Sequence, residues 1–212
     1  MIEKQIDPLV SIIIPVYNGS NYLERAIRSA INQTYPNIEI IAVDDASPDG
    51  TRSILEKNAT TDNRLIVFIT EKNIGYNKNF EKAIRLCSGK YIAISDQDAI
   101  WDTEKLAKMM NLWPDEAQFI YSLSGNFTDT DFENRTAAPQ VVYTPIDHVL
   151  KLVFNSPVHG HACMFKKERV PLCTPFPDNI FYDWWMSMHA ARLSVIPCVP
   201  QTLTWHRLHA AN

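Results

Sequence analysis

Two carboxylates, Asp96 and Asp98, stand at the end of the apolar stretch 91–94, with only Gln97 between them. The stretch is typical of a buried strand, and two like charges at its end repel each other and are costly to bury unpaired. A divalent cation would supply the missing positive charge and would in turn bridge phosphate oxygens. Such a pair alone is weak support because it is common in solvated turns, but its position at a strand end predicts a metal site.

Acids also stand at two other predicted element ends. Asp44 and Asp45 end a second apolar stretch, where a carboxylate can accept hydrogen bonds from a ribose or a base N–H, or can simply cap the loop. Asp183 precedes Trp184 and Trp185 at a predicted helix start, where an acid can be an N-cap. Partial burial against the indole rings would instead raise its pKa towards that of a general base. Both interpretations stay open for each of these acids.

Histidines gather in two segments of the second half. His159 and His161 flank Gly160 ahead of an apolar stretch, and a histidine in such a place is more often a structural hydrogen-bonding group than a ligand. The segment 205–209, WHRLH, combines two imidazoles with a guanidinium near the C-terminus. These groups suit a third metal ligand and a phosphate contact.

The elements that must position these residues alternate between strand and helix in the first half. Apolar, β-branched runs predict strands at 10–16, 38–43, 65–69 and 91–95. Helical spacing predicts a helix capped by Ser20 through 23–31, a short helix through 54–55, one over 76–87, and one capped by Asp102 through 106–109. The alternation predicts an α/β fold with a parallel sheet and right-handed crossovers. Ligands of such sheets bind beyond the carboxyl ends of the strands.

The pattern changes after Ala117. In order, the sequence predicts a strand at 118–124, a long polar loop at 125–145, a helix at 146–154, a strand at 160–165, a helix at 183–193 and a short strand at 195–199. We expect this half to complete a site on the first half and not to fold alone.

Composition, net charge and cysteine spacing argue against several classes of protein. The 212 residues are 46% hydrophobic and suit one globular domain, and a net charge of −4 without a basic stripe argues against nucleic acid as the main partner. The apolar stretch near the N-terminus is too short for a membrane span and too interrupted for a signal peptide. Four cysteines without CxxC or zinc-ligand spacing predict reduced thiols in a cytosolic protein. The first strand ends in PVYNG and not in a GxGxxG turn, which disfavours a dinucleotide oxidoreductase.

Taken together, these residues resemble a known family. The segments VSIIIPVYNGSNYLERAIRSAINQTYPNIEIIAVDDASPDGT, NIGYNKNFEKAI, GKYIAISDQDAIW, VHGHACMFKKE, YDWW and LTWHRLHAAN are similar, in this order, to motifs of inverting family 2 glycosyltransferases. The most similar members are rhamnosyltransferase-like and build bacterial surface polysaccharides. The resemblance implies the GT-A fold, an α/β fold with a mostly parallel central sheet flanked by helices. It also implies a single domain over 1–212, with a nucleotide-binding half to about 115 and an acceptor and catalytic half from about 116.

The resemblance assigns a role to each matching position. It implies that the nucleotide is bound by Pro15, Tyr17, Asn18, Asp44, Asp45, Lys78, Asp96 and Gln97. It implies that Asp98 is the principal ligand of Mn²⁺ or Mg²⁺, that Asp96 assists and that His209 closes the metal site. Asp183 would be the catalytic base. The sugar and acceptor pocket would be lined by Gly160, His161, Trp184, Trp185 and Arg207.

The implied reaction moves a sugar from a dTDP- or UDP-sugar to a saccharide or lipid-linked oligosaccharide. The resemblance places the protein in the cytoplasm, with peripheral contact to the inner membrane face. Two positions depart from the family: Ala99 stands where relatives often carry a further acid, and the chain stops at Asn212, where many relatives continue. We therefore expect either a shortened chain or a minimal acceptor side.

Two other functions compete with this one. A nucleotidyltransferase would carry a glycine-rich, basic loop after the first strand, and PVYNGSNY has neither feature. A non-catalytic module that binds nucleotide sugars or glycans would not need Asp183 to be an acid.

Overall fold

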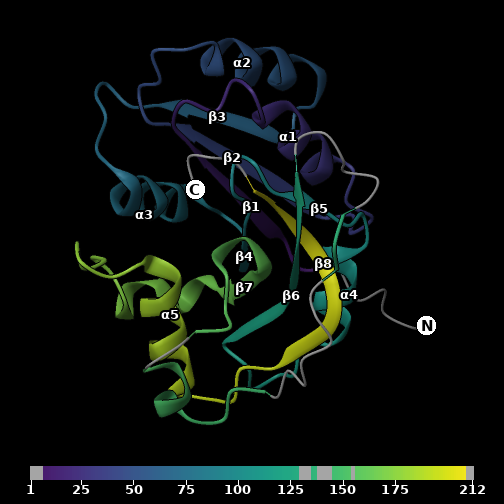
Figure 1. The fold of residues 1–212 in the computed structure, drawn as a ribbon, viewed down its shortest axis with the longest axis vertical. Coiled ribbons are helices and arrows are strands. Elements are labelled where there is room, and N and C mark those ends of the chain that lie inside the picture. Colours follow the sequence, from purple (N-terminus) through teal and green to yellow (C-terminus); the bar gives the residue numbers. More distant parts are fainter. Residues whose placement is uncertain (1–6, 129–134, 138–144, 154–155, 209–212) are drawn as a thin grey trace.

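The computed structural model describes residues 7–128, 135–137, 145–153 and 156–208. Over these ranges the strands form one eight-stranded sheet in the order β3-β2-β1-β4-β7-β6-β8-β5 (Figure 1). The strands are β1 (Val10–Val16), β2 (Ile38–Asp44), β3 (Leu65–Ile69), β4 (Tyr91–Ile94), β5 (Ile100–Trp101), β6 (Phe119–Thr128), β7 (Cys163–Lys166) and β8 (Cys198–Leu208). The α-helices are α1 (Leu23–Ile31), α2 (Thr51–Thr61), α3 (Tyr76–Leu86), α4 (Lys105–Asn111) and α5 (Tyr182–Ala191). Three 3-10 helices complete the described elements: η1 (Val149–Leu152), η2 (Gly160–Ala162) and η3 (Lys167–Leu172).

The first four strands run parallel to one another. β1 pairs with β2 on one side and with β4 on the other, and β2 pairs with β3. The chain therefore moves outward from β1 to β3 and returns to the other side of β1 for β4. This reversal between β1 and β4 is the kind of switch point at which open α/β sheets bind ligands.

Both faces of the sheet are covered, as the continuous apolar runs predict. Side chains alternate along a strand, so Ile13 of β1 points to one face while Ile12 and Ile14 point to the other. The first face packs against α3 and α5, and the second against α1, α2 and α4 (Figure 1). The two cores contain residues from both halves of the sequence, because β6, β7 and α5 extend the layers that begin in the first half.

The strands of the first half were predicted closely, whereas several expectations for the second half are wrong. The predicted loop at 125–145 begins inside β6, and Asn126 forms an antiparallel bridge with Thr136. The predicted helix at 146–154 is instead a bridge between Ile146 and Ile196 followed by the short η1. The short strand at 195–199 is instead the eleven-residue β8, which pairs with β6 over most of its length. The bridges and pairings that replace these elements lie between distant segments.

Two helix caps are also corrected. α1 begins after Tyr22, and the backbone N–H of Ser20 donates to Asp49 Oδ2 at 3.1 Å. α4 begins after Glu104, whose N–H donates to Asp102 Oδ1 at 2.9 Å, so Asp102 holds the preceding turn. Within the described part of the chain, no helix is long and apolar enough to cross a membrane.

Candidate active site

A cavity of about 580 Å³ opens at the carboxyl ends of β1, β2 and β4. Six residues expected to bind the donor or metal line it: Pro15, Tyr17, Asp45, Asp96, Gln97 and Asp98. The remaining lining residues are Val16, Asn73, Gly75, Tyr76, Asn79, Phe80 and His206. We call this space the donor cavity. It joins residues as far apart in the chain as Pro15 and His206, which the sheet brings together.

The side chain of Gln97 fixes the end of β1. Its Oε1 accepts a hydrogen bond from the backbone N–H of Tyr17 at 2.9 Å, and its Nε2 donates to the Tyr17 carbonyl at 3.1 Å. The Tyr17 ring itself is 45% exposed, so a planar base can stack on it. The next residue, Asn18, takes a positive φ of 52° and donates its N–H to Ser47 Oγ. Asn18 therefore shapes the turn beside the cavity and does not line it.

The carboxylate of Asp45 is fully engaged by the protein. Its Oδ1 accepts from Thr70 Oγ1 and from the N–H of Ile74, at 3.1 and 2.9 Å, and its Oδ2 accepts from the N–H of Gly75 at 3.0 Å. Gly75 has a φ of 88°, which side-chain-bearing residues rarely adopt. Asp45 thus holds the loop that forms one wall of the donor cavity. Its neighbour Asp44 is buried and accepts from the N–H of Ser47, outside the cavity.

Asp96 has one engaged oxygen and one without a partner. Its Oδ2 lies 3.0 Å from His161 Nδ1, and His161 Nε2 lies 2.8 Å from Ser124 Oγ. Its Oδ1 is buried and has no hydrogen-bond partner in the described ranges. Burial alone would raise the pKa of Asp96, but the hydrogen bond and charge of His161, with His206 and Lys105, lower it overall. The carboxylate is thus held ionised with an oxygen left to coordinate a cation.

His206 of β8 completes this group. Its Nδ1 lies 4.0 Å from Asp98 Oδ1, and its ring stacks on His161 with centroids 5.0 Å apart. Ligand atoms of Asp96, His161 and His206 all lie within 4.8 Å of one another. Both nitrogens of His161 are already engaged, so His161 orients Asp96. The carboxylates of Asp96 and Asp98 and the imidazole of His206 are ligand types that divalent cations accept. His209 lies outside the described residues.

Asp183 is positioned by two backbone amides in the first turn of α5. Its Oδ2 accepts from the N–H of Gly160 at 2.9 Å and its Oδ1 from that of Trp184 at 2.8 Å. Burial raises the pKa of Asp183, and the nearby charge of Asp96 adds to the rise, while these two amides and His161 oppose it. Its N-cap is Phe181, so Asp183 does not serve as the cap of the helix.

Gly160 belongs to the support of Asp183 and not to the wall of the donor cavity. A Cβ at this position would lie 1.9 Å from the hydroxyl oxygen of Tyr182, a distance that no real side chain tolerates. The absence of a side chain therefore lets η2 approach α5 closely enough for the amide of Gly160 to reach Asp183.

Other expected pocket residues lie elsewhere. The indole N–H of Trp184 donates to the Leu152 carbonyl and that of Trp185 to the Cys173 carbonyl, and both rings pack on the core. Arg207 points away from its neighbour His206, as alternation along β8 requires, and its guanidinium lies over the ring of Tyr22. None of the three lines the donor cavity.

Lys78 and Lys105 differ from what the sequence suggested. Lys78, expected beside the diphosphate, is exposed and lines a neighbouring cavity.

Lys105 had no expected role, yet it is fully buried. Its Nζ donates to the His161 carbonyl at 2.5 Å and lies 3.6 Å from the centroid of the Trp101 ring, and burial holds its pKa well below the usual range. The amphipathic pattern of this helix does not indicate that its lysine is buried.

The sequence model of glycosyl transferase family 2 matches residues 11–172, which include every donor-cavity residue except His206. The chain belongs to this family. An uncharacterized glycosyltransferase of Rickettsia prowazekii (strain Madrid E) is 41% identical over 221 residues, covering 100% of this chain and 68% of that protein. The family expected from the sequence motifs is thereby confirmed.

A second relative carries a more specific description. A UDP-Glc:alpha-D-GlcNAc-diphosphoundecaprenol beta-1,3-glucosyltransferase of Escherichia coli is 36% identical over 124 residues, which cover 58% of this chain and 48% of that protein. This member of the family therefore spans from about half to about two thirds of the length of these two relatives.

Solved structures confirm the GT-A fold. A mannosyltransferase of Pyrobaculum calidifontis, solved in complex with GDP-Man and Mn²⁺, superposes with a TM-score of 0.73 at 23% identity. The superposition covers 97% of this chain and 59% of the mannosyltransferase. At this identity the likeness concerns the fold alone. It agrees with the layered sheet described above.

Proposed function

We propose that this chain is the catalytic unit of a metal-dependent, inverting glycosyltransferase. The donor is a dTDP- or UDP-sugar, and the acceptor is a saccharide or a lipid-linked oligosaccharide of bacterial surface polysaccharide synthesis. The observation that carries the proposal is the buried Oδ1 of Asp96, which has no hydrogen-bond partner among the described residues and lies near Asp98 and His206 at the switch point of the sheet. A carboxylate held ionised in such a place is suited to a cation and, through it, to a diphosphate.

The relatives support the donor and acceptor classes. The Escherichia coli relative is described as using UDP-Glc and a diphosphoundecaprenol-linked acceptor, and the Pyrobaculum calidifontis structure contains GDP-Man and Mn²⁺. As part of the proposal, we extend to the present chain the UDP-linked donor and lipid-linked acceptor of the first and the Mn²⁺ of the second. A lipid-linked acceptor would bring the enzyme to the cytoplasmic face of the inner membrane. Rhamnose is retained as a candidate sugar on the motif resemblance.

In the proposed complex the nucleotide occupies the donor cavity, with its base on the exposed ring of Tyr17. Asp98, Asp96 and His206 would hold Mn²⁺ or Mg²⁺, with His209 as a further ligand from the C-terminal segment. The cation, when bound, neutralises the charge that develops on the departing diphosphate. Asp96 is kept in place for this by its contact with His161.

Asp183 takes the proton from the acceptor hydroxyl as that oxygen attacks the anomeric carbon. Its raised pKa makes it a better base than an ordinary aspartate, and the amides of Gly160 and Trp184 fix its orientation. The new C–O bond forms as the bond to the diphosphate breaks. A single displacement of this kind inverts the anomeric centre and needs no covalent enzyme intermediate.

The replacement Asp183→Asn tests the assignment. Nucleotide sugars are first ranked by thermal shift with Mn²⁺, and the best donor is then used in hydrolysis and transfer assays. We expect the variant to keep its nucleotide affinity within about twofold and to lose at least about 100-fold in turnover, as expected for removal of a general base. The matched control is Asp115→Asn, an exposed acid outside the donor cavity.

Two outcomes would contradict the proposal. Turnover that survives Asp183→Asn would place the base elsewhere. Tight binding of nucleotide sugars by the wild type without any hydrolysis or transfer would favour a non-catalytic binding module.

A further inference from the structure

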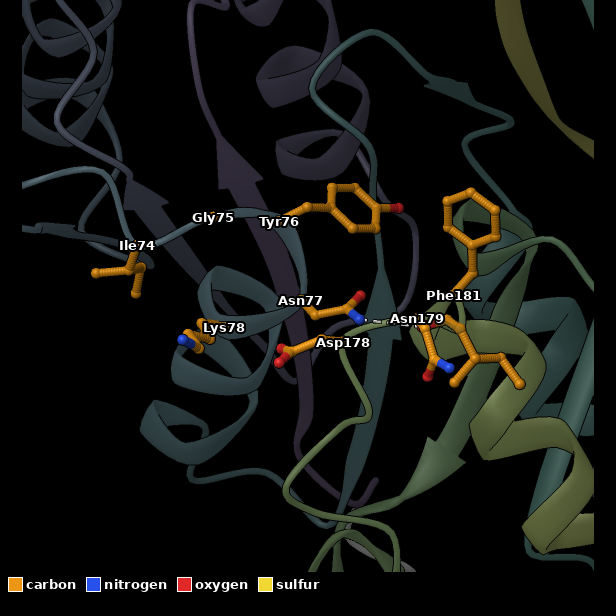
Figure 2. A pocket seen from close by; sticks show the side chains of 9 residues that line it. Ile74, Gly75, Tyr76, Asn77, Lys78, Asp178, Asn179 and Phe181 are labelled. Atoms are coloured by element: carbon orange, nitrogen blue, oxygen red, sulfur yellow. Dashed lines mark hydrogen bonds between the residues drawn. The ribbon is translucent and has the colours of Figure 1, made fainter.

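A second cavity lies beside the donor cavity, between the start of α3 and the segment before α5 (Figure 2). Its volume is about 510 Å³, and it is lined by Ile74, Gly75, Tyr76, Asn77, Lys78, Asp178, Asn179, Ile180 and Phe181. Gly75 and Tyr76 line both cavities, so the two spaces are neighbours across these residues. We call the second space the Tyr76–Phe181 cavity.

Two exposed aromatic rings mark this cavity. Tyr76 is 54% exposed and Phe181 is 66% exposed, and their rings are perpendicular with centroids 6.4 Å apart. Figure 2 shows the Tyr76 side chain extending towards Phe181. On its other side the Tyr76 ring contacts Phe80 and Tyr182, at 4.6 and 5.6 Å between centroids. The ring is therefore held in place without a ligand, and much of its surface stays open.

Amide and charged groups stand next to the rings. Asn77 Nδ2 donates to the carbonyls of Pro177 and Ile180, at 2.8 and 3.0 Å, and so ties the segment before α5 to α3. Asn77 lines the cavity, and its buried Oδ1 has no hydrogen-bond partner within the described part of the chain. Asp178 and Asn179 are exposed and add further acceptors and donors.

This combination fits a neutral saccharide better than a second nucleotide. The C–H face of a sugar ring packs on an aromatic face, and its hydroxyls pair with amides and carboxylates. The single cation Lys78 is offset by the single acid Asp178, so the wall has no cluster of positive charge for a phosphate group.

We propose that the Tyr76–Phe181 cavity binds a saccharide unit of the acceptor, one or two residues from the hydroxyl that reacts. Phe181 is the N-cap of α5 and lies two positions before Asp183, so this wall of the cavity and the proposed base belong to the same helix start. The assignment rests on the proposed function, since it names where the acceptor of that reaction is held. The cavity supplies no reacting group.

The test measures saccharide binding directly. Methyl glycosides of cellobiose, laminaribiose, chitobiose and rhamnobiose are titrated into the wild-type protein by saturation-transfer-difference NMR, with and without UDP and Mn²⁺. We expect millimolar binding of at least one disaccharide, and at least a fivefold loss of affinity in Phe181→Ala. Leu112→Ala removes another exposed apolar side chain, at the end of α4, and is expected to bind as the wild type does. Asp178→Ala, a change on the exposed segment, is expected to weaken binding without touching the aromatic pair.

Affinity for UDP separates the possible results. Phe181→Ala is expected to leave UDP binding within twofold of the wild type. An equal loss of UDP affinity would assign the cavity to the nucleotide and overturn the inference, as would unchanged disaccharide affinity in Phe181→Ala or no disaccharide binding by the wild type. Disaccharide binding without any UDP binding would contradict the proposed donor site and leave the cavity assignment standing.

Discussion

The donor cavity has two walls that use their acids in opposite ways. The wall at the ends of β1 and β2 contains Asp45, and each of its oxygens accepts a hydrogen bond from the protein. The wall at the ends of β4 and β8 contains Asp96, Asp98 and His206, and Asp96 keeps one buried oxygen without a partner in the described residues. Both walls are acidic, but within the described part of the chain the one buried carboxylate oxygen without a hydrogen-bond partner belongs to the second wall.

The two walls therefore have different roles: the first maintains the shape of the cavity, and the second can bind a cation. A buried carboxylate is stable only when its charge is compensated, and backbone amides compensate Asp45 within the folded chain. On the other wall His161 compensates part of the charge of Asp96, and a bound cation would compensate the rest. We therefore expect changes at Asp45 to appear in stability and changes at Asp98 to appear in ligand binding.

The largest expected effect is on metal-dependent binding. Asp98→Ala should lower the affinity for UDP in the presence of Mn²⁺ at least about 100-fold, or about 2.7 kcal/mol, and should abolish the response to the metal. Isothermal titration with and without Mn²⁺ measures both quantities, with Asp115→Ala as the control. If the wild type bound UDP equally well without Mn²⁺, the assignment of the second wall as the metal site would be wrong.

The second effect is on folding. Asp45→Ala leaves the amides of Ile74 and Gly75 without their acceptor and leaves the Thr70 hydroxyl only its longer contact, 3.4 Å, with the Asp44 carbonyl. It should therefore lower the free energy of unfolding by about 2 to 4 kcal/mol. Urea unfolding of the metal-free protein measures this loss. Asp98→Ala should cost much less in the same assay. A reversed order of the two variants would show that the walls have been assigned the wrong roles.

The sequence predicted the first wall and most of the first half well. Strands 10–16 and 65–69 were predicted with the bounds that the structure has. For 10–16 the reason is a run of β-branched residues that is buried on both faces and has few other folds available. Their order along the chain then placed Asp44, Asp45, Asp96 and Asp98 at one edge. The alternation of strands and helices was sufficient for this, without any knowledge of tertiary contacts.

The second half depends on contacts that local patterns do not contain. β8 has polar residues at many positions and is a strand because it pairs with β6 on one side and with the two-residue β5 on the other. Consequently local patterns point to the histidines of segment 205–209 but not to His206 as the one that lies beside Asp98. The support of Asp183 by Gly160 and the burial of Lys105 likewise arise only in the folded chain.

Asp183 is an intermediate case between the two walls, and the pH dependence of the activity tests its role. It has one amide donor for each oxygen, yet burial and the charge of Asp96 raise its pKa overall, while the His161 charge opposes the rise. A base works only when deprotonated, so activity should fall as the pH drops through this raised pKa. The acid limb of the rate profile for donor hydrolysis, measured at saturating Mn²⁺, should lie above the ordinary aspartate value of about 4. A limb at or below that value would contradict the assignment of Asp183 as the base.

The smallest expected effect is on the free energy of unfolding when Lys105, which lies behind the second wall, is replaced. Lys105 is fully buried, and burial lowers its pKa because burial disfavours the charged form. Lys105→Met keeps the packing volume and removes the hydrogen bond to the His161 carbonyl, along with the cost of burying the amine. These terms oppose each other, and the free energy of unfolding should change by no more than about 1 kcal/mol. Lys105→Ala, which also leaves a void, should cost about 2 kcal/mol or more. Urea unfolding of both variants distinguishes packing from charge: a large loss in Lys105→Met would mean that the ammonium itself holds His161, and through it Asp96, in the second wall.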